Sequence, residues 1–367
     1  MSNRLVGILI DPLIYQGILH QENTRENPHF YEEGAKAYGL SPIYFRLKDL
    51  RIREGTVLAL TKEGTRVQRR SCPIPDIIHN RIIPKNWRER EVLRRLTRSG
   101  KKIFNRVNRL SKWSVYRLLR KEPSLHPHLP QTYLANRATL TLMMNRYSNL
   151  ILKPDNGSIG EGIMRLERKG KRWNLNYPTR LRNGRTRWKH ISFTTKIPQF
   201  LLKRLQQRKY LVQEGISFVK KEGRPFDLRV AVQKEYGGKW KVTGIVAKVA
   251  AKGHFLTNVA RGGKCHPLEE VLANHPSLTP ALVESRLIPL ALQAAHLLEK
   301  QVPFLADMGL DMGCNEEGHL YLIEINLRDL RITFRNAGLL EAWKRVHATP
   351  MAYAAYLLDQ QERKATP

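Results

Sequence analysis

Mainly apolar runs and amphipathic segments alternate near the start of the chain. Residues 4–10 form a mainly apolar run, which predicts a buried strand. The pattern over 30–38 is typical of a helix, and strands are expected at 42–45 and 77–79. This order predicts a small open α/β domain. His79-Asn80-Arg81 lies where such sheets place ligand contacts, although we favour a structural role for this triplet.

In the second half of the chain, apolar and polar residues alternate in a pattern that predicts paired strands. Over 226–233 the alternation puts Asp227 and Arg229 on the polar face of one strand. The chain returns along 240–249, where Lys248 falls in phase with apolar neighbours. A cation on a mainly apolar face needs an anionic partner or must extend towards solvent.

A hairpin near the C-terminus combines an apolar pattern with acidic residues. Strand parity places Leu322, Glu324 and Asn326 on one face, and a symmetric turn at 315–318 would put Asp311 opposite Leu322. Asp311 would then be diagonal to Glu324, so that both carboxylates could reach one hard cation. Mg²⁺ prefers such oxygen ligands. The alternative is a solvated hairpin face.

A glycine-rich loop follows the short strand predicted at 150–154. The loop at 155–161, Asp-Asn-Gly-Ser-Ile-Gly-Glu, leads into a returning strand at 162–166. Because a strand follows and Gly-Lys-Ser/Thr is missing, it is neither a Walker A loop nor a dinucleotide-binding fingerprint. A glycine-rich loop between two strands is instead typical of a flap over phosphates. Lys153 at the end of the first strand favours this interpretation over an ordinary glycine-containing hairpin.

Net charge sets this chain apart from an ordinary globular protein. It has 64 Lys and Arg against 32 Asp and Glu, a formal charge of +32 and a pI near 10.4. This predicts attraction to polyanions such as nucleic acid, acidic protein, anionic polymers or nucleotide phosphates, unless the basic residues only form a solvated surface. Cys72, Cys265 and Cys314 are widely spaced and odd in number, which indicates neither a disulfide framework nor a zinc site and favours a reducing compartment.

Basic residues are concentrated between residues 87 and 121. A helix is predicted over 86–98, and another begins after Ser111 as its N-cap. Lys112 then lies in the first helical turn, an unfavourable place for a cation unless it meets a phosphate there. The segment could bind nucleic acid, but a solvated helix face is the commoner explanation. We expect no signal peptide and no transmembrane helix, and core packing for the amphipathic helix over 280–300.

Six motifs follow one another in an order that resembles that of the ATP-grasp superfamily. Their residue sequences are similar to those of its YheC/YheD endospore-coat-associated branch. The motifs are Lys-Pro-Asp-Asn-Gly-Ser-Ile-Gly-Glu-Gly (153–162), Gln-Glu-Gly-Ile (213–216), Asp-Leu-Arg-Val (227–230), Thr-Asn-Val-Ala-Arg-Gly-Gly (257–263), Asp311 and Glu-Ile-Asn (324–326). The resemblance implies α+β subdomains of an ATP-grasp fold, preceded by a small open α/β pre-ATP-grasp domain. The expected divisions are 1–105 for that domain, 106–210 with the flap, 211–359 with the Mg²⁺ site, and a frayed tail at 360–367.

The resemblance further implies that ATP and Mg²⁺ bind between the two subdomains. The residues expected to contact phosphates, adenine and ribose are Lys112, Lys153, Gly157, Ser158, Gly160, Gly162, Gln213, Glu214 and Ile216. Those expected near the γ-phosphate and the acceptor are Arg229, Lys248, Asn258 and Arg261. The expected Mg²⁺ ligands are Asp311, Glu324 and Asn326. Leu-Arg-Asp-Leu-Arg follows, where many relatives have small or proline residues, which leaves substrate recognition around Arg328 and Arg331 open.

These implications make an ATP- and Mg²⁺-dependent ligase the leading hypothesis. It would join a carboxylate to an amine or a thiol through an acyl phosphate, with an anionic substrate in keeping with the basic charge. We expect it in the mother-cell cytoplasm or on the spore coat, with spore-coat proteins as partners and no membrane. The alternatives are a non-catalytic spore-coat protein with the same fold, and a nucleic-acid-binding protein acting through 87–121.

Overall fold

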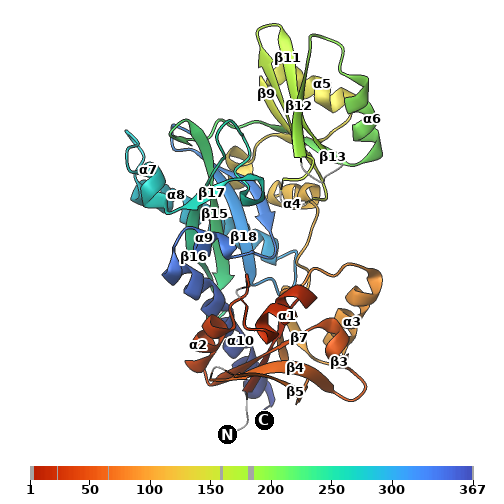
Figure 1. The fold of residues 1–367 in the computed structure, drawn as a ribbon, viewed down its shortest axis with the longest axis vertical. Helices are drawn as coiled ribbons and strands as arrows, with labels where there is room; N and C mark the ends of the chain where they lie inside the picture. Colours follow the sequence, from red (N-terminus) through yellow and green to blue (C-terminus); the bar gives the residue numbers. More distant parts are fainter. Residues whose placement is uncertain (1–3, 23, 65, 158–159, 181–185, 366–367) are drawn as a thin grey trace.

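The computed structural model describes residues 4–22, 24–64, 66–157, 160–180 and 186–365. Within these residues three β-sheets follow one another along the longest axis of the molecule (Figure 1). We name the parts built on them the first domain (4–105), the flap subdomain (130–214) and the central subdomain (106–129 and 215–339). The central subdomain lies between the other two (Figure 1).

The first domain is an open α/β unit, as the sequence predicts. Its sheet has the order β3-β4-β2-β1-β6-β7, with β5 paired to β4, and β1 is parallel to both β2 and β6. The strands are β1 (Arg4–Leu9), β2 (Leu40–Phe45), β3 (Leu50–Arg51), β4 (Thr56–Glu63), β5 (Arg66–Pro73), β6 (Ile77–Asn80) and β7 (Lys102–Phe104). The helices are α1 (Pro12–Leu19), α2 (Pro28–Lys36) and α3 (Trp87–Arg98).

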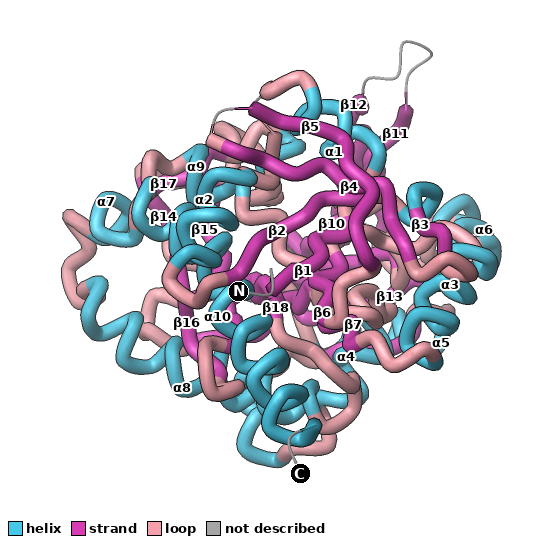
Figure 2. The backbone as a smooth tube through the Cα atoms, turned by 90° about the horizontal axis from the view of Figure 1, so that it is seen from below, coloured by secondary structure: helices cyan, strands magenta, loops and turns pink. Residues whose placement is uncertain are grey.

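The last helix, α10 (Leu340–Ala365), completes the first domain. Met351, Ala354 and Leu358 belong to the same buried cluster as Val6 and Ile8 of β1. Viewed from below, α10 lies beside these strands (Figure 2). The helix continues through residues 360–365, over which the sequence predicts a frayed tail.

The flap subdomain is an antiparallel sheet with helices on one face. Its strand order is β12-β11-β10-β9-β13-β8. The elements are β8 (Thr132–Leu134), α5 (Arg137–Arg146), β9 (Asn149–Pro154), β10 (Met164–Lys169), β11 (Arg172–Arg180), β12 (Thr186–Phe193), α6 (Gln199–Gln207) and β13 (Tyr210–Glu214). Leu140 of α5 and Leu201 of α6 pack against Leu150 and Leu166 of the sheet. The glycine-rich loop joins β9 to β10, which pair antiparallel as predicted.

The central subdomain carries the hairpin on which the predicted metal site depends. Its sheet has the order β17-β16-β15-β18-β19, with β14 paired to β15. The strands are β14 (Lys220–Lys221), β15 (Arg224–Lys234), β16 (Trp240–Val249), β17 (Lys264–His266), β18 (Asp307–Cys314) and β19 (Leu320–Asn326). The helices are α4 (Lys112–Leu119), α7 (Leu268–Leu272), α8 (Pro280–Glu299) and α9 (Ile332–Asn336).

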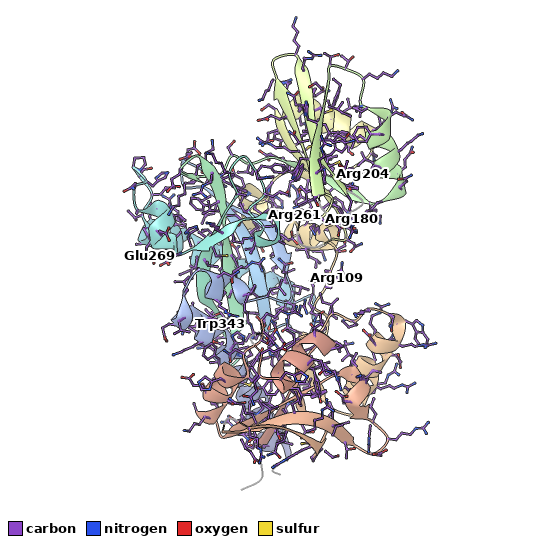
Figure 3. The ribbon with its side chains drawn as sticks, in the orientation of Figure 1. Arg109, Arg180, Arg204, Arg261, Glu269 and Trp343 are labelled. Atoms are coloured by element: carbon purple, nitrogen blue, oxygen red, sulfur yellow. The ribbon has the colours of Figure 1, made fainter. Side chains whose placement is uncertain are left out.

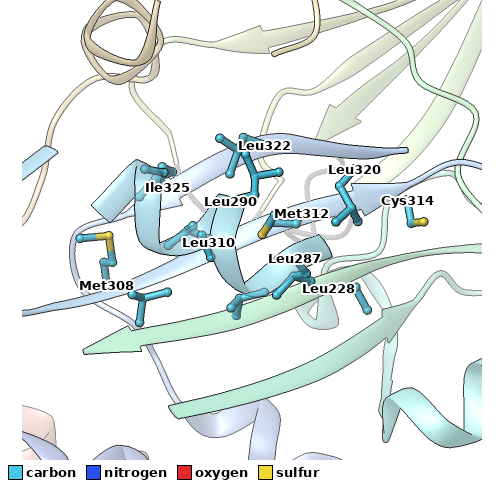
Figure 4. Packing of buried hydrophobic residues seen from close by; sticks show 14 of the residues in the cluster. Leu228, Leu287, Leu290, Met308, Leu310, Met312, Cys314, Leu320, Leu322 and Ile325 are labelled. Atoms are coloured by element: carbon cyan, nitrogen blue, oxygen red, sulfur yellow. The ribbon is translucent and has the colours of Figure 1, made fainter. Parts of the chain in front are cut away.

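Helix α8 covers the core face of the central sheet. Its Leu287 and Leu290 belong to one buried cluster with Leu228, Leu310 and Met312 (Figure 4). Among the described residues, α8 is the one helix long and apolar enough to cross a membrane by length and composition. Its buried side chains lie in the core of the subdomain, as expected.

A β-bulge at Ile323 decides which residues of the hairpin face the core. Asp311 lies opposite Glu324, but the next residue, Met312, lies opposite Leu322, so Ile323 is an extra residue on β19. The bulge puts Leu322 in the core and Glu324 on the other face. Two predictions were therefore wrong: Leu322 and Glu324 do not share a face, and Asp311 does not lie opposite Leu322. Strand parity and a symmetric turn assume an unbroken ladder.

Candidate functional site

A cavity of about 560 Å³ lies where the flap and central subdomains meet. This volume is within the range typical of small-molecule sites. Its described wall includes residues of α4, the glycine-rich loop and strands β9, β13, β15, β16, β18 and β19. Cations outnumber anions among the lining residues: Arg109, Lys112, Lys153, Arg229, Lys248 and Arg328 against Asp155, Glu161, Asp311 and Glu324.

Two lysines, Lys153 from the flap subdomain and Lys112 from α4, lie beside the hairpin. Lys153, at the end of β9, is buried and its Nζ donates to the carbonyl of Ile323 at 3.0 Å. The Nζ of Lys112 donates to the carbonyl of Gly157 at 2.9 Å and lies 3.3 Å from Oε1 of Glu324. The glycine-rich loop and the hairpin are thus linked through side chains that carry positive charge.

Burial lowers the pKa of Lys153 to about 8, although Glu324 counteracts the shift. The nearby Lys112 acts in the same direction as burial. The nearby carboxylates therefore do not fully offset the cost of burying this ammonium group. Such a group gains stability when an anion enters the cavity.

The start of α4 is fixed against the end of β9. Ser111 caps the helix, as predicted, because its hydroxyl accepts from the backbone N–H of Ser114. The backbone N–H of Trp113 donates to Oδ1 of the buried Asp155 at 2.9 Å, and that of Lys112 to its carbonyl. Asp155 thereby positions Lys112 in the first helical turn, facing the cavity.

Asp311 is the centre of a buried group of charges on β15, β16 and β18. Its carboxylate accepts from Nε and Nη2 of Arg229 at 2.9 and 3.1 Å, and from Nζ of Lys248 at 2.7 Å. Nζ of Lys248 also lies 3.1 Å from Oδ1 of Asp227. Lys248, the cation predicted on a mainly apolar face, is thus paired with two carboxylates. Burial opposes ionisation of Asp311, but Arg229 and Lys248 hold its pKa below the usual range.

The three predicted metal ligands share one face of the β18–β19 hairpin. Asp311 pairs with Glu324, and Asn326 lies opposite Gly309 on that face. Carboxylate and amide oxygens are a donor set that suits Mg²⁺. Within the described residues no three His, Cys, Asp or Glu side chains gather to hold a metal. Arg229 and Lys248 already hydrogen-bond to the Asp311 carboxylate. The three side chains therefore fit a metal ion that takes further oxygen ligands from a phosphate.

The glycine-rich loop reaches the opposite wall of the cavity. Gly160 has a φ of +69°, and a Cβ on it would lie 2.9 Å from Oδ1 of Asn258. Only glycine fits this close approach without strain. Gly157 and Asn258 also line the cavity, whereas Gly162 lies against the hydroxyl of Tyr210. Ser158 lies outside the described residues.

The structure brings most, but not all, of the predicted residues to the cavity. The described cavity wall includes Lys112, Lys153, Gly157, Gly160, Gln213, Arg229, Lys248, Asn258, Asp311, Glu324 and Asn326. It does not include Gly162, Glu214, Ile216 or Arg261. The Glu214 carboxylate accepts from the backbone N–H of Gln131. Nη1 of Arg261 donates to Thr186 at 2.8 Å, at the edge of the flap subdomain near Arg180 (Figure 3).

Sequence reasoning missed two carboxylates that position cavity residues. One is Asp155, which anchors α4. The other is Asp329, whose Oδ1 accepts from Nη1 of Arg229 at 3.0 Å. The only available signal for Asp329 was a single acid within the unusual segment Leu-Arg-Asp-Leu-Arg.

The residues around Arg81 form a buried network between the first domain and the hairpin. Arg81 contacts Glu26 at 2.8 Å and Asp307 at 2.9 Å. Arg331 donates to Asp307 and to the hydroxyl of Tyr31. We name this group, with its members Glu26, Arg81, Asp307 and Arg331, the junction network. The structural role favoured for Arg81 is confirmed, and Arg331 lies outside the cavity wall.

These features define the class of protein: the fold is ATP-grasp. The ATP-grasp ligase PsnB, solved with a phosphomimetic variant of a minimal precursor, Mg and ADP, superposes with a TM-score of 0.54 over 97% of this chain and 99% of PsnB. The sequence identity is 15%, so this likeness concerns the fold. The predicted fold class is confirmed.

The chain belongs to the YheC/D-like ATP-grasp family, whose model matches residues 100–357. It is 26% identical over 317 residues to the endospore coat-associated protein YheD of Bacillus subtilis (strain 168), covering 84% of this chain and 68% of YheD. It is 22% identical over 297 residues to YheC of the same organism, covering 79% of this chain and 80% of YheC. The predicted branch of the superfamily is confirmed.

Proposed function

We propose that this protein is an ATP- and Mg²⁺-dependent ligase that activates a carboxylate as an acyl phosphate, which an amine or a thiol then attacks. One observation carries the proposal: Asp311 and Glu324 lie directly opposite each other, with Lys112 and Lys153 beside them, in one cavity beneath the glycine-rich loop. This arrangement supports a phosphate site next to a site for a hard cation. The family and the ATP-grasp neighbours support this choice.

The proposal gives each side of the cavity a task. Lys112 and Lys153 bind the phosphates of ATP, and the glycine-rich loop covers them. Gln213, which lines the cavity on β13, contacts the adenine and ribose side of the nucleotide. Asp311, Glu324 and Asn326 would hold Mg²⁺, which would neutralise charge on the transferred phosphoryl group.

Arg229 and Lys248 act on the reaction through charge and position. Both hold Asp311 ionised, and their hydrogen bonds fix the position of its carboxylate. Both also line the cavity, where their positive charge favours the developing negative charge of phosphoryl transfer. Asn258 meets the glycine-rich loop across the cavity. Closure there would keep water from an acyl phosphate.

Replacing Glu324 by Gln tests the proposal. We expect ADP release, measured with a panel of small amino acids and acidic peptides, to fall about 10²–10³-fold, the usual effect of losing one electrostatic contact to the transition state. The fold should persist, because this side chain is 29% exposed. Glu317→Gln, in the exposed turn of the same hairpin, is the matched control and should keep its activity. Wild-type turnover in Glu324→Gln would refute the proposal.

The names of the relatives favour a second proposal, which concerns where the protein is located in the cell. YheD and YheC are described as endospore coat-associated, and we propose the same association for this chain, formed in the mother-cell cytoplasm. A coat protein could retain the fold and bind ATP without chemistry. Wild-type protein that binds Mg-ATP but releases no ADP with any member of the panel would favour this alternative.

A further inference from the structure

The cavity extends past the metal ligands to a second, differently lined end. Arg328, Thr333 and Asn336 contribute to its wall from the segment that follows β19. Asn108 and Arg109 contribute from the segment that precedes α4. Arg328 comes two residues after Asn326, so this end adjoins the proposed Mg²⁺ ligands. None of these five residues has a task in the phosphate site.

Arg328 differs from Arg229 in having no carboxylate partner among the described residues. Arg229 is paired with Asp311 and Asp329. Among the described residues, by contrast, no carboxylate lies within 4.0 Å of the Arg328 guanidinium. Its Nη1 donates to the carbonyl of Arg81 at 2.8 Å, and its Nε is buried without any hydrogen-bond partner. The Arg328 guanidinium is therefore left without a direct ion-pair partner.

Arg328 is partly buried, and the positively charged residue Arg81 lies beside it. A buried cation without a counter-ion is costly. A bound anion would offset that cost, which makes this end of the cavity electrostatically suited to a carboxylate.

Two further residues of the cavity wall, Thr333 and Asn108, each have a buried side-chain oxygen without a hydrogen-bond partner. The Thr333 hydroxyl is buried without a partner and can donate to a carboxylate. Oδ1 of Asn108 is also buried without a partner, while its amide nitrogen donates to the carbonyl of Ile82. The free oxygen can only accept, for example from an N–H group. The set thus suits a molecule that carries both a carboxylate and an N–H.

We infer that Arg328, with Thr333, binds a carboxylate of the acceptor substrate, and that the acceptor is an amino acid or a peptide. The term acceptor rests on the proposed function, but the anion site itself does not. Arg328 is accordingly a specificity-determining residue, and the unusual Leu-Arg-Asp-Leu-Arg segment supplies it.

A thermal unfolding experiment without nucleotide tests this site. The probe is sodium N-acetylglutamate, compared with sodium chloride at equal ionic strength. The wild type should unfold about 2 °C higher in N-acetylglutamate than in chloride. Arg328→Met should lose this excess, because it removes the charge that binds the carboxylate. Arg335→Met is the matched control: Arg335 is exposed on α9 and outside the cavity wall, so its variant should keep the excess.

The outcomes separate this inference from the proposed function. A full excess in Arg328→Met, or no excess in the wild type, would overturn the carboxylate site. Should Arg328→Met fail to fold, Thr333→Val decides, with a reduced excess supporting the site and an unchanged one refuting it. Because no ATP is present, loss of turnover in Glu324→Gln does not affect this result.

Discussion

Two neighbouring groups of charged side chains differ in whether their charges are satisfied. In the junction network, Arg81 and Arg331 are held by Glu26 and Asp307, all almost completely buried. In the cavity, cations outnumber anions and Lys153 is buried beside too little negative charge. A closed network fixes the geometry of a domain junction, whereas an open one leaves charge for a ligand to complete.

The two groups are connected through Asp329. Its side chain accepts from Arg229 in the cavity wall, and its backbone carbonyl accepts from Nη2 of Arg81 in the junction network. The first domain therefore supports the segment that follows the metal hairpin. Substitutions in the two groups should have opposite consequences: those in the junction network should change stability, and those in the cavity should change binding.

The largest expected effect is on stability, from Asp307→Asn. This change leaves Arg81 and Arg331 buried with Glu26 alone, so the free energy of unfolding should fall by about 3–5 kcal/mol. Denaturant unfolding measures the loss. Asp76→Asn is the control, because Asp76 forms an exposed pair with Lys101 and should cost at most about 1 kcal/mol. Equal effects of the two variants would remove the distinction between the groups.

Lys153→Met should show the reverse behaviour. Removing a poorly compensated buried charge should leave the free energy of unfolding nearly unchanged. The loss of a charged contact to phosphate, worth about 1.5–3 kcal/mol, should weaken Mg-ATP binding about 10–100-fold in calorimetric titration. A strongly destabilised variant with wild-type affinity would instead place Lys153 with the junction network.

The pH dependence of nucleotide binding also tests whether Lys153 contacts a phosphate of ATP. The pKa of Lys153 is lowered to about 8 in the free protein, and a bound phosphate should raise it. Binding then takes up a proton, so the affinity for Mg-ATP should fall about tenfold between pH 7 and 9, or about 1.4 kcal/mol. Titrations across this range measure it. Lys153→Met should lose the dependence, and an unchanged slope would exclude this lysine.

The smallest expected effect concerns acid sensitivity of the junction. Burial lowers the pKa of His79 to about 4, below its value of about 6.5 in an unfolded chain. On acidification the unfolded chain therefore takes up this proton first, and stability falls between about pH 6.5 and 4. His79→Gln should lose about 1 kcal/mol less than the wild type between pH 7 and 5.5. Denaturant unfolding at both pH values checks this, and equal losses would contradict it.

Local patterns predicted the cavity better than they predicted its surroundings. Alternation along β15 placed Asp227 and Arg229 on one face, and the phase of Lys248 predicted either an anionic partner or an extension towards solvent. The structure shows the first of these: Lys248 pairs with Asp311 at 2.7 Å and with Asp227 at 3.1 Å. The glycine-rich loop and the end of β9 were recognisable because a strand–loop–strand unit is encoded by adjacent residues.

Features that depend on distant residues escaped prediction. The pairing of Arg81 with Asp307 joins positions far apart in the chain, and no local pattern reports it. The bulge at Ile323 is a single inserted residue in an otherwise regular apolar alternation. The second half of α10 gives no sign in its own sequence that it packs against the first domain. Each of these depends on tertiary packing, which propensity and periodicity do not encode.

A crystal structure with a non-hydrolysable ATP analogue and Mg²⁺ tests the central claim most directly. We predict the triphosphate between Lys112 and Lys153, beneath the glycine-rich loop, with the metal contacting Asp311, Glu324 and Asn326. A nucleotide bound elsewhere, or a metal that contacts none of these three side chains, would contradict it.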